Sequence, residues 1–343
     1  MAAYISFQPS DFFNTKLYTG TGSSNAITGV GFQPAFTWIK ARAGSKSHRL
    51  FDSTRGVTKW IASDNTGAES TTAESLKSFD SDGFTLGTYD HVNDNTVAFV
   101  SWNWKAGTTS GIAGSPSITP TSYSFNQTSG FSIIKYTGNY TSGATLPHGL
   151  NKKPSMILVK NLSTGGDWAV YSSVLGATKY MNLNTTGAAA SATTRWNDTE
   201  PTSTLFSIGN TDLVNTNGDD YIAYCFAEKK GYSKFGSYIG NGNADGTFVY
   251  TGFRPAFFML KKSSGPDQGW LIVDDKRGYN TSNDKMYADS AAADTLKKNS
   301  LLSNGWKVEE ASDTYNENGS TYIYAAFAEF PIVSSNDIPG TAR

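Results

Sequence analysis

Short apolar runs separated by turns dominate the chain, and the same runs recur three times. One run follows a proline in each copy and is apolar almost throughout, at residues 36–40, 156–160 and 257–261. A later run alternates in polarity, so that Val100, Trp102 and Trp104 share one face of a predicted strand. Its counterparts end at Phe226 and Phe327, and we expect these closing aromatics to face the core. Both patterns are typical of β-strands.

Fixed landmarks accompany these runs. Each copy has a proline, a lysine a fixed distance after it, and an asparagine ahead of the closing strand: Pro34, Lys40 and Asn93; Pro154, Lys160 and Asn215; Pro255, Lys261 and Asn316. Repetition at this period indicates triplication of one folding unit. We therefore predict an all-β fold of three tandem antiparallel β-sandwich repeats of jelly-roll or lectin-like type. The expected boundaries are 1–105, 131–230 and 231–331, with a Gly/Ser/Thr/Pro linker at 106–130 and a C-terminal tail at 332–343.

The connections between copies differ in length. The second and third copies are joined so closely that we expect them to dock rigidly, whereas the linker allows the first copy a different angle. Within the third copy, residues 290–300 are compatible with one short helix.

Composition narrows the functional classes. The 343 residues include 34 glycines, 13% aromatics and 17% charged residues, a mixture typical of a turn-rich β-protein. The net charge of −1, with no basic cluster, argues against nucleic-acid partners, and the lack of a long apolar run argues against membrane insertion. The single cysteine, Cys225, excludes an intrachain disulfide and is expected to be a small packing residue.

No catalytic motif is evident, so we expect no enzyme, no catalytic residues, no cofactor and no metal site. The three histidines, His48, His91 and His148, form no recognisable pattern, and His48 stands where the other copies carry Trp168 and Trp270. A glycan depolymerase, with Glu69 and Glu74 or Glu309 and Glu310 as its carboxylates, is a minor alternative. The oxygen-rich stretches at 80–83 and 215–220 are better explained as hairpin turns than as calcium loops.

One pair of opposite charges recurs. Asp52 and Arg55 reappear as Asp274 and Arg277, but the second copy has Ser172 and Leu175 instead. Two interpretations stay open: a polar binding site lost once, or a structural ion pair.

Aromatic residues near polar ones are the candidates for ligand binding. Trp196 lies in a loop without an aromatic counterpart in the other copies, next to Asn197 and Asp198. Trp60 and Tyr180 occupy corresponding positions. Exposed rings of this kind can stack on sugars, with burial beneath the loops as the alternative.

Several strings resemble a known family, covering essentially the whole chain and most specific in the second and third copies. They include Leu-Pro-His-Gly-Leu at 146–150, Trp-Asn-Asp-Thr-Glu-Pro at 196–201 and Tyr-Ile-Ala-Tyr-Cys-Phe-Ala-Glu at 221–228. The chain resembles tailed-bacteriophage virion and tail-fibre-like structural proteins with repeated β-sandwich units, common in phages of aquatic bacteria.

The resemblance implies a virion structural protein on the tail or capsid exterior, assembled in the host cytoplasm. A tail-fibre-type adhesin for host attachment, binding a surface glycan as receptor, is the leading expectation. The alternative is a capsid or tail decoration protein that binds other virion proteins. In either role we expect a homo-oligomer in the virion.

Overall fold

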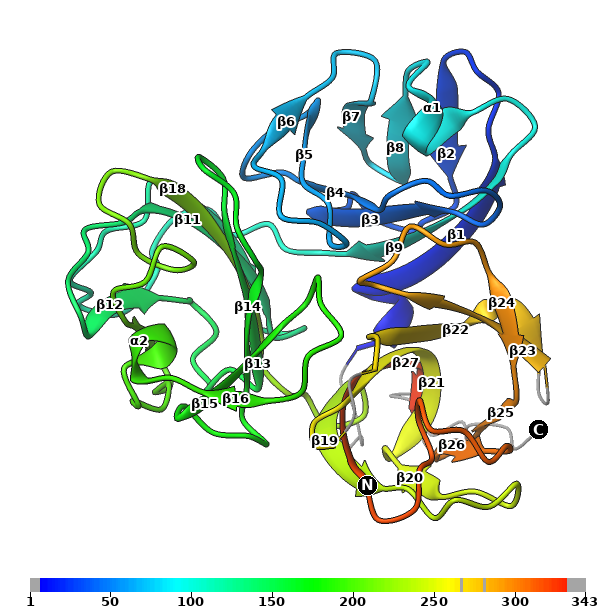
Figure 1. Ribbon diagram of the computed structural model, residues 1–343. Helices are drawn as coiled ribbons and strands as arrows, with labels where there is room; N and C mark the ends of the chain where they lie inside the picture. The colour runs from blue at the N-terminus through cyan, green and yellow to red at the C-terminus, as the bar shows by residue number, and fades with distance from the viewer. Residues whose placement is uncertain (1–6, 266–267, 280–281, 332–343) are drawn as a thin grey trace.

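The computed structural model describes residues 7–265, 268–279 and 282–331, and within these ranges the chain is all-β, as predicted (Figure 1). Strand pairing is antiparallel throughout the paired strands of this part of the chain. We call residues 7–105, 131–230 and 231–331 units 1, 2 and 3, and residues 106–130 the linker. Figure 1 shows the three units arranged around a common centre.

Each unit has an inner sheet in which the first strand pairs with the last, and the last with the strand after the proline. In unit 1 the order is β1 (Phe13–Thr19), β9 (Ala98–Trp104), β3 (Phe36–Ala41) and β4 (Arg49–Asp52). In unit 2 the order is β10 (Ser122–Asn126), β11 (Phe131–Thr137), β18 (Asp220–Phe226), β13 (Met156–Asn161), β14 (Ala169–Ser172), β15 (Lys179–Asn182) and β16 (Ala190–Ser191). In unit 3 the order is β19 (Ser233–Ile239), β27 (Thr321–Pro331), β21 (Phe253–Lys262), β22 (Leu271–Tyr279), β23 (Ser282–Tyr287) and β24 (Thr295–Lys297).

A smaller outer sheet accompanies each inner one. The outer sheets are β2 (Asn25–Thr28), β8 (Gly83–Leu86) and β7 (Leu76–Asp80); β12 (Ala144–Pro147) and β17 (Leu205–Ile208); and β20 (Phe248–Tyr250), β26 (Gly305–Val308) and β25 (Asn299–Leu302). The remaining elements are the pair β5 (Lys59–Trp60) and β6 (Ser70–Thr71), the 3-10 turn η1 (Pro9–Asp11), and the single-turn helices α1 (Asp90–Asn93) and α2 (Thr193–Trp196).

The repeated asparagine and glycine landmarks fix a loop in each unit. In unit 1 the Asn93 amide donates to the carbonyls of Ser23 and Gly87 and accepts from the backbone N–H of Thr21. A Cβ on Gly20 would lie 2.0 Å from the carbonyl oxygen of Asp94, so only glycine fits there. The equivalent asparagines make similar bonds: Asn215 with Asn139, Thr141 and Gly209, and Asn316 with Asn241, Asn243 and Glu310. These landmarks are therefore structural.

The inner faces of the three inner sheets form one central hydrophobic core. Trp104, Phe226 and Phe327 meet there, with ring centroids 5.6 to 6.2 Å apart. All three are buried, which confirms the prediction that the closing aromatics face the core. Between its inner and outer sheets each unit has a separate second core, as Ile27, Phe84 and Phe99 illustrate for unit 1.

Two of the three recurring lysines, Lys160 and Lys261, join neighbouring units. Lys160 of unit 2 is fully buried, and its Nζ donates to the carbonyls of Gly166, at 2.5 Å, and of Thr66 in unit 1, at 3.0 Å. Lys261 of unit 3 donates in the same way to Thr186 of unit 2, at 2.6 Å. A ring nitrogen accompanies each joint: Trp168 Nε1 to the carbonyl of Ala62, Trp270 Nε1 to that of Asn182, and His48 Nε2 to that of Tyr287. The ring-nitrogen contact thus also joins unit 3 back to unit 1, where Lys40 instead donates to the carbonyl of Ala41 in its own unit.

Four sequence expectations need correction or limits. Residues 290–300 contain no helix; they include β24 and the start of β25. Unit 1, for which the linker allowed a different angle, contributes residues to the same central core as the other units. The linker folds onto unit 2 and supplies β10 to its inner sheet. The tail at 332–343 lies outside the described residues.

Candidate functional site

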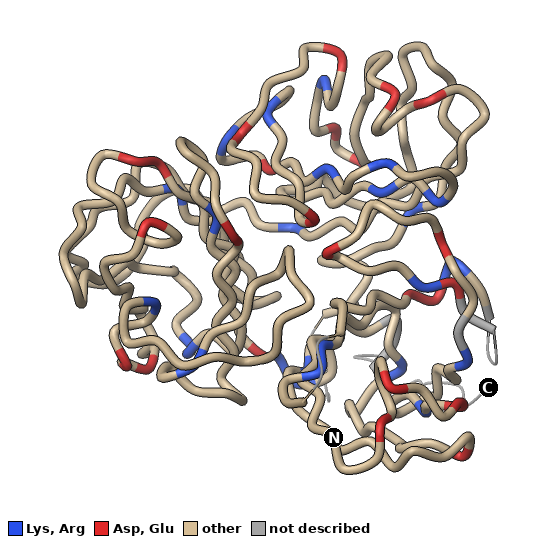
Figure 2. Tube along the Cα trace, in the orientation of Figure 1, with Lys and Arg blue, Asp and Glu red and all other residues tan. Residues whose placement is uncertain are grey.

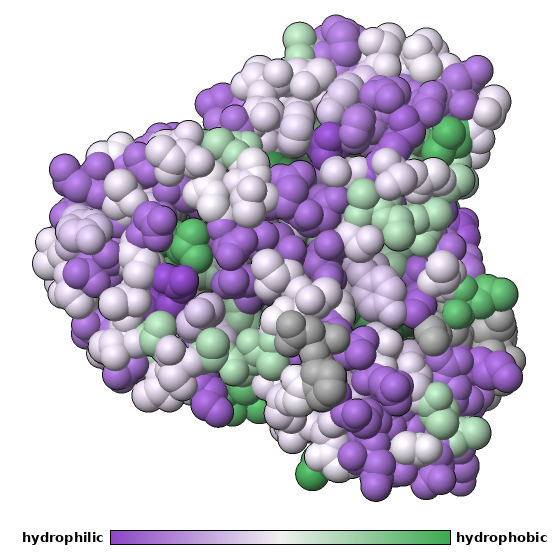
Figure 3. All heavy atoms as spheres, viewed as in Figure 1, coloured by the Kyte–Doolittle hydropathy of each residue, from purple (hydrophilic) through white to green (hydrophobic). Residues whose placement is uncertain are grey.

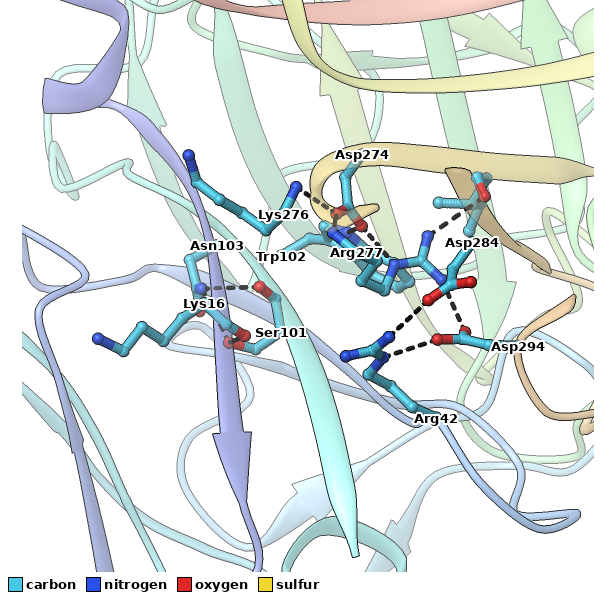
Figure 4. A network of polar contacts seen from close by, with 11 residues as sticks. Lys16, Arg42, Ser101, Trp102, Asn103, Asp274, Lys276, Arg277, Asp284 and Asp294 are labelled. Atoms are coloured by element: carbon cyan, nitrogen blue, oxygen red, sulfur yellow. Dashed lines mark hydrogen bonds and ion pairs between the residues drawn. The ribbon is translucent and has the colours of Figure 1, made fainter. Parts of the chain in front are cut away.

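A buried polar network lies where unit 3 meets unit 1 (Figure 4). Nε of Arg277 donates to Oδ2 of Asp274 at 2.6 Å, and Nε1 of Trp102 in unit 1 donates to the same oxygen at 2.8 Å. Arg277 also donates to Asp294 at 2.9 Å. The side chains of Asp274 and Arg277 are both buried. The recurring charge pair is therefore part of the joint between units.

Arg42 extends this network from unit 1. Its guanidinium donates to Asp294 at 2.7 Å and to Asp284 at 2.6 Å, both in unit 3. Burial raises the pKa of Asp294, although the charges of Arg277 and Arg42 oppose that rise. Each of these charges has an opposite charge within hydrogen-bond distance, as a buried ion-pair network requires.

The joint between units 1 and 2 repeats the arrangement. Nε of Arg55 donates to Oδ2 of Asp52 at 2.5 Å, and the Tyr224 hydroxyl of unit 2 donates to the same oxygen at 2.7 Å. Burial acts to lower the pKa of Arg55, but the charge of Asp52 outweighs it and raises that pKa. At the third joint Ser172 replaces the aspartate, and Ala325 stands in the strand position of Tyr224. The third joint therefore lacks both the carboxylate acceptor and the side chain that would donate to it. This fits the interpretation of the recurring charge pair as a structural ion pair, and not as a polar binding site.

The predicted ligand residue Trp196 is buried. Its side chain is 1% exposed and lies edge-on to Tyr171 in the core of unit 2, with centroids 5.8 Å apart. The expectation of an exposed ring at this loop is therefore wrong. The single turn α2 carries the tryptophan inward, so it offers no face to a sugar at the surface.

Asn197 and Asp198 form the turn after α2, with left-handed φ values of 53° and 46°. The Asn197 side chain accepts a hydrogen bond from the Ser142 hydroxyl at 3.0 Å. Asp198 is exposed. Both residues are accessible, but their neighbour Trp196 is not.

Trp60 and Tyr180 are half-buried, and an arginine stacks on each. The guanidinium of Arg49 lies 3.9 Å from the ring centre of Trp60, and that of Arg195 lies 4.7 Å from Tyr180. One face of each ring is occupied in this way. Trp60 belongs to unit 1 and Tyr180 to unit 2, so the five predicted residues do not form one site.

His148 and Cys225 are both buried in unit 2. Leu150 N–H donates to His148 Nδ1, which leaves Nε2–H to donate to the carbonyl of Thr202, and burial lowers the pKa of His148 to about 4. Burial raises the pKa of Cys225 to about 12, so its thiol is not reactive near neutral pH. In the described ranges, no group of three or more His, Cys, Asp or Glu residues could hold a metal ion.

Two open grooves flank the joints. One, of about 500 Å³, lies where unit 1 meets the linker, and hydroxyl, amide and apolar groups line it: Ser53, Ser78, Thr109, Ser124, Gln33, Lys77, Pro34, Val57 and Phe79. The other, of about 490 Å³, lies along β1 between Gly29–Gly31 and Lys276 of unit 3. Figure 2 shows positive and negative residues distributed over all three units, so charge does not single out either groove.

An exposed apolar surface on unit 3 is the feature that sequence reasoning missed. Ile239, Phe248 and Tyr250 are 61%, 43% and 58% exposed. Ile239 ends β19, and its carbonyl accepts from the Thr247 hydroxyl next to β20, so the two strands meet there. On the face shown in Figure 3 the surface is mostly hydrophilic or neutral, with small separate hydrophobic patches. Phe235 of β19 lies in the central core and Val249 of β20 in the second core, so Ile239 points to the inner-sheet face, whereas Phe248 and Tyr250 share the outward face of the outer sheet. We call Phe248 and Tyr250 the unit 3 patch.

The fold and joints define an all-β protein of three units closed around one core. Residues 8–331 match the model of a protein family described as a domain of unknown function, DUF7483, and the chain belongs to that family. No curated protein and no solved structure matches the chain. Among the residues described, none of the helices is long and apolar enough to cross a membrane.

Proposed function

We propose that the protein is a non-enzymatic structural component on the exterior of a tailed-phage virion, present in several copies and bound to other virion proteins. The resemblance of units 2 and 3 to such proteins supports the setting. We further infer that the units are tandem copies of one jelly-roll-like β-sandwich. The common strand order of their inner sheets supports that inference.

The unit 3 patch is the observation that carries the role in assembly. Apolar side chains gathered at an open sheet edge are typical of protein contact surfaces. The ring of joints supports the same role, because it holds three units in a fixed orientation without a disulfide. By contrast, the aromatic rings expected to bind glycans are buried or already stacked on arginine.

Locating the chain in purified particles tests this function. We expect mass spectrometry to detect it in the particle and cryo-electron microscopy to place it on the capsid or tail exterior. Particles that lack the chain while the host lysate contains it would contradict the proposal.

The groove beside the linker favours a second function, a glycan-binding adhesin. Its hydroxyl and amide groups can bind sugar hydroxyls, and Pro34, Val57 and Phe79 offer an apolar wall. In this case Ser53→Trp, which fills the groove, should abolish binding of host polysaccharide in calorimetry. Ser173→Trp, at the corresponding place in unit 2, is the matched control and should leave binding unchanged. Equal binding by both variants would reject this groove as the site.

A further inference from the structure

The groove along β1 exposes the edge of a strand. β1 is an edge strand, and among the described residues no strand pairs with its outer side. The N–H of Gly20 and the carbonyl of Phe12 hydrogen-bond to residues that flank β9, at the two ends of the paired region. Because backbone groups alternate in direction along an antiparallel strand, the N–H groups of Thr15 and Leu17 point to the open edge. Both residues line the groove, whose volume is about 490 Å³.

The other two units show what occupies this position of the strand. The registers of the first and last strands align Thr15 with Ile133 in unit 2 and with Phe235 in unit 3. Ile133 pairs with β10 of the linker. The Phe235 N–H instead donates to the Glu228 carboxylate at 3.2 Å, and the same carboxylate accepts from Lys234 Nζ at 3.2 Å. Unit 3 therefore holds a carboxylate between a backbone N–H and a lysine at its strand edge.

Unit 1 has the donors of this arrangement but no acceptor. In the described ranges, neither the N–H nor the hydroxyl of Thr15 has a hydrogen-bond partner. Thr15 is 8% exposed and lines the groove, so the hydroxyl is buried at its wall. A buried donor without a partner carries a desolvation cost. A bound carboxylate would remove that cost, because its two oxygens accept several hydrogen bonds.

Lys16 supplies a positive charge that is not neutralised by an ion pair. Its Nζ lies above Gly29, where an added Cβ would come within 2.9 Å of it. No hydrogen bond or ion pair of this Nζ is found in the part of the chain that the structure describes. The Asp82 carboxylate interacts with Lys16 electrostatically, but its two oxygens accept from the N–H groups of Gly29 and Gly31 at 2.9 and 2.6 Å. The ammonium group of Lys16 is thus available to a second anion.

Lys276 borders the same groove from unit 3. Its backbone N–H donates to Asp274 at 3.0 Å and its Nζ pairs with Asp275 at 2.8 Å, so the irregular part of β22 holds it in place. Figure 4 shows Lys16 and Lys276 to one side of the network around Arg277. Over whole units charge singles out neither groove, but the residues that line this one include two lysines and no carboxylate.

We propose that this groove binds an acidic side chain from an extended segment of a neighbouring virion protein. The carboxylate accepts from the N–H and the hydroxyl of Thr15, and it lies near Lys16 and Lys276. The Glu228 carboxylate in unit 3 is the model for this contact. Hydrogen bonds between charged groups of this kind are stronger than neutral ones.

A polypeptide fits the groove better than an acidic sugar does. Both occupants that the chain itself places at this edge, β10 and Glu228, are polypeptide. The unpaired backbone groups of an edge strand also match the main chain of another extended segment. The inference rests on the proposed role in the virion, and it specifies the chemistry of the partner.

The probe is the blocked peptide Thr-Val-Glu-Val-Thr, compared with Thr-Val-Gln-Val-Thr. Ligand-observed NMR with the full-length chain gives both dissociation constants, and the amide spectrum of the chain locates the site. We expect the glutamate peptide to bind about tenfold more tightly, about 1.4 kcal/mol, and to shift the Thr15 amide. Lys16→Gln should reduce that preference to about twofold or less. Lys77→Gln is the matched control, because Lys77 lines the other groove of unit 1, and it should keep the preference.

Thr15→Val tests the hydroxyl. We expect it to weaken binding of the glutamate peptide about threefold, the value of one hydrogen bond. The melting temperature should not fall, because this hydroxyl has no partner to lose among the described residues.

Three results would overturn the proposal. They are equal binding of the two peptides, a preference that survives Lys16→Gln, and tighter binding of an oligogalacturonate than of the glutamate peptide, which would assign the groove to an acidic glycan. These measurements use the purified chain and do not depend on its place in the particle. Their failure would leave the proposed function standing, whereas particles that lack the chain would contradict that function even if the peptide binds.

Discussion

The indole Nε1–H of Trp102, in unit 1, donates a 2.8 Å hydrogen bond to the buried Asp274 carboxylate of unit 3. Trp102→Phe removes that donor, and we expect a loss of about 1.5–3 kcal/mol in the free energy of unfolding, since a hydrogen bond to a buried charge is worth that much. Urea denaturation measures it. Trp168→Phe is the matched control, because the Trp168 indole donates to the neutral carbonyl of Ala62 and should cost about 1 kcal/mol less. Equal losses would show that the charge of Asp274 does not strengthen the joint.

Lys160 should make the free energy of unfolding change with pH in the alkaline range. Burial lowers the pKa of Lys160 to about 8 in the folded chain, against 10.5 for the free side chain. Between these values the unfolded chain binds one more proton, so stability rises with pH, by up to about 3 kcal/mol across pH 8–10.5. In urea denaturation between pH 8 and 10.5, the free energy of unfolding of the native chain should rise by that amount relative to that of Lys160→Met. The exposed Lys179→Met is the control. Parallel curves for the native chain and Lys160→Met would contradict the lowered pKa.

His148 should contribute to acid sensitivity. Burial lowers the pKa of His148 from 6.5 to about 4, so below pH 6.5 the unfolded chain takes up a proton that the folded chain does not. The native chain should therefore lose up to about 3 kcal/mol from this group as the pH falls from 6.5 to 4. His148→Gln should have a flatter profile over that range. His91→Gln, which alters a partly exposed histidine, should flatten it less. If both variants follow the native profile, His148 is not the group responsible.

Trp196→Ala should destabilise the chain as strongly as Phe226→Ala. Both side chains are buried, and removing a large buried aromatic costs about 3–5 kcal/mol. Thermal unfolding with calorimetry compares the two. Trp60→Ala, at a half-buried ring, should cost less. A near-native melting temperature for Trp196→Ala would mean that the side chain contributes little to the core. Trp196 would then again be a candidate for ligand binding.

The strands and their buried faces were predictable because they depend on local alternation and on repeated landmarks. Trp104, Phe226 and Phe327 face the core as their period-two pattern predicts. The burial of Trp196 was not predictable, since it depends on Tyr171, and nothing in the local pattern of a loop shows which way it folds. A single unrepeated residue offers no internal comparison.

The joints were visible in the sequence only as spacing. Lys160 was noticed because it recurs, but its carbonyl acceptor at Thr66 belongs to the preceding unit. A contact at that sequence separation leaves no periodic signal. The unit 3 patch was not predicted for a similar reason. Phe248 of unit 3 and Thr145 of unit 2 differ in polarity, but they can be compared only when strand register shows that they occupy the same position.

The central core also determines when the chain can finish folding during synthesis. Phe13 stacks on Phe327 with ring centroids 5.4 Å apart. The first strand therefore cannot complete its packing until the last strand has been synthesised. Roughly 300 residues separate them, which at about 5–20 residues per second is on the order of 15–60 s of translation. During that interval the inner face of the first sheet is exposed to water and to other nascent chains. We expect expression at low temperature or with added chaperones to raise the soluble yield, and truncation before Phe327 to yield aggregates.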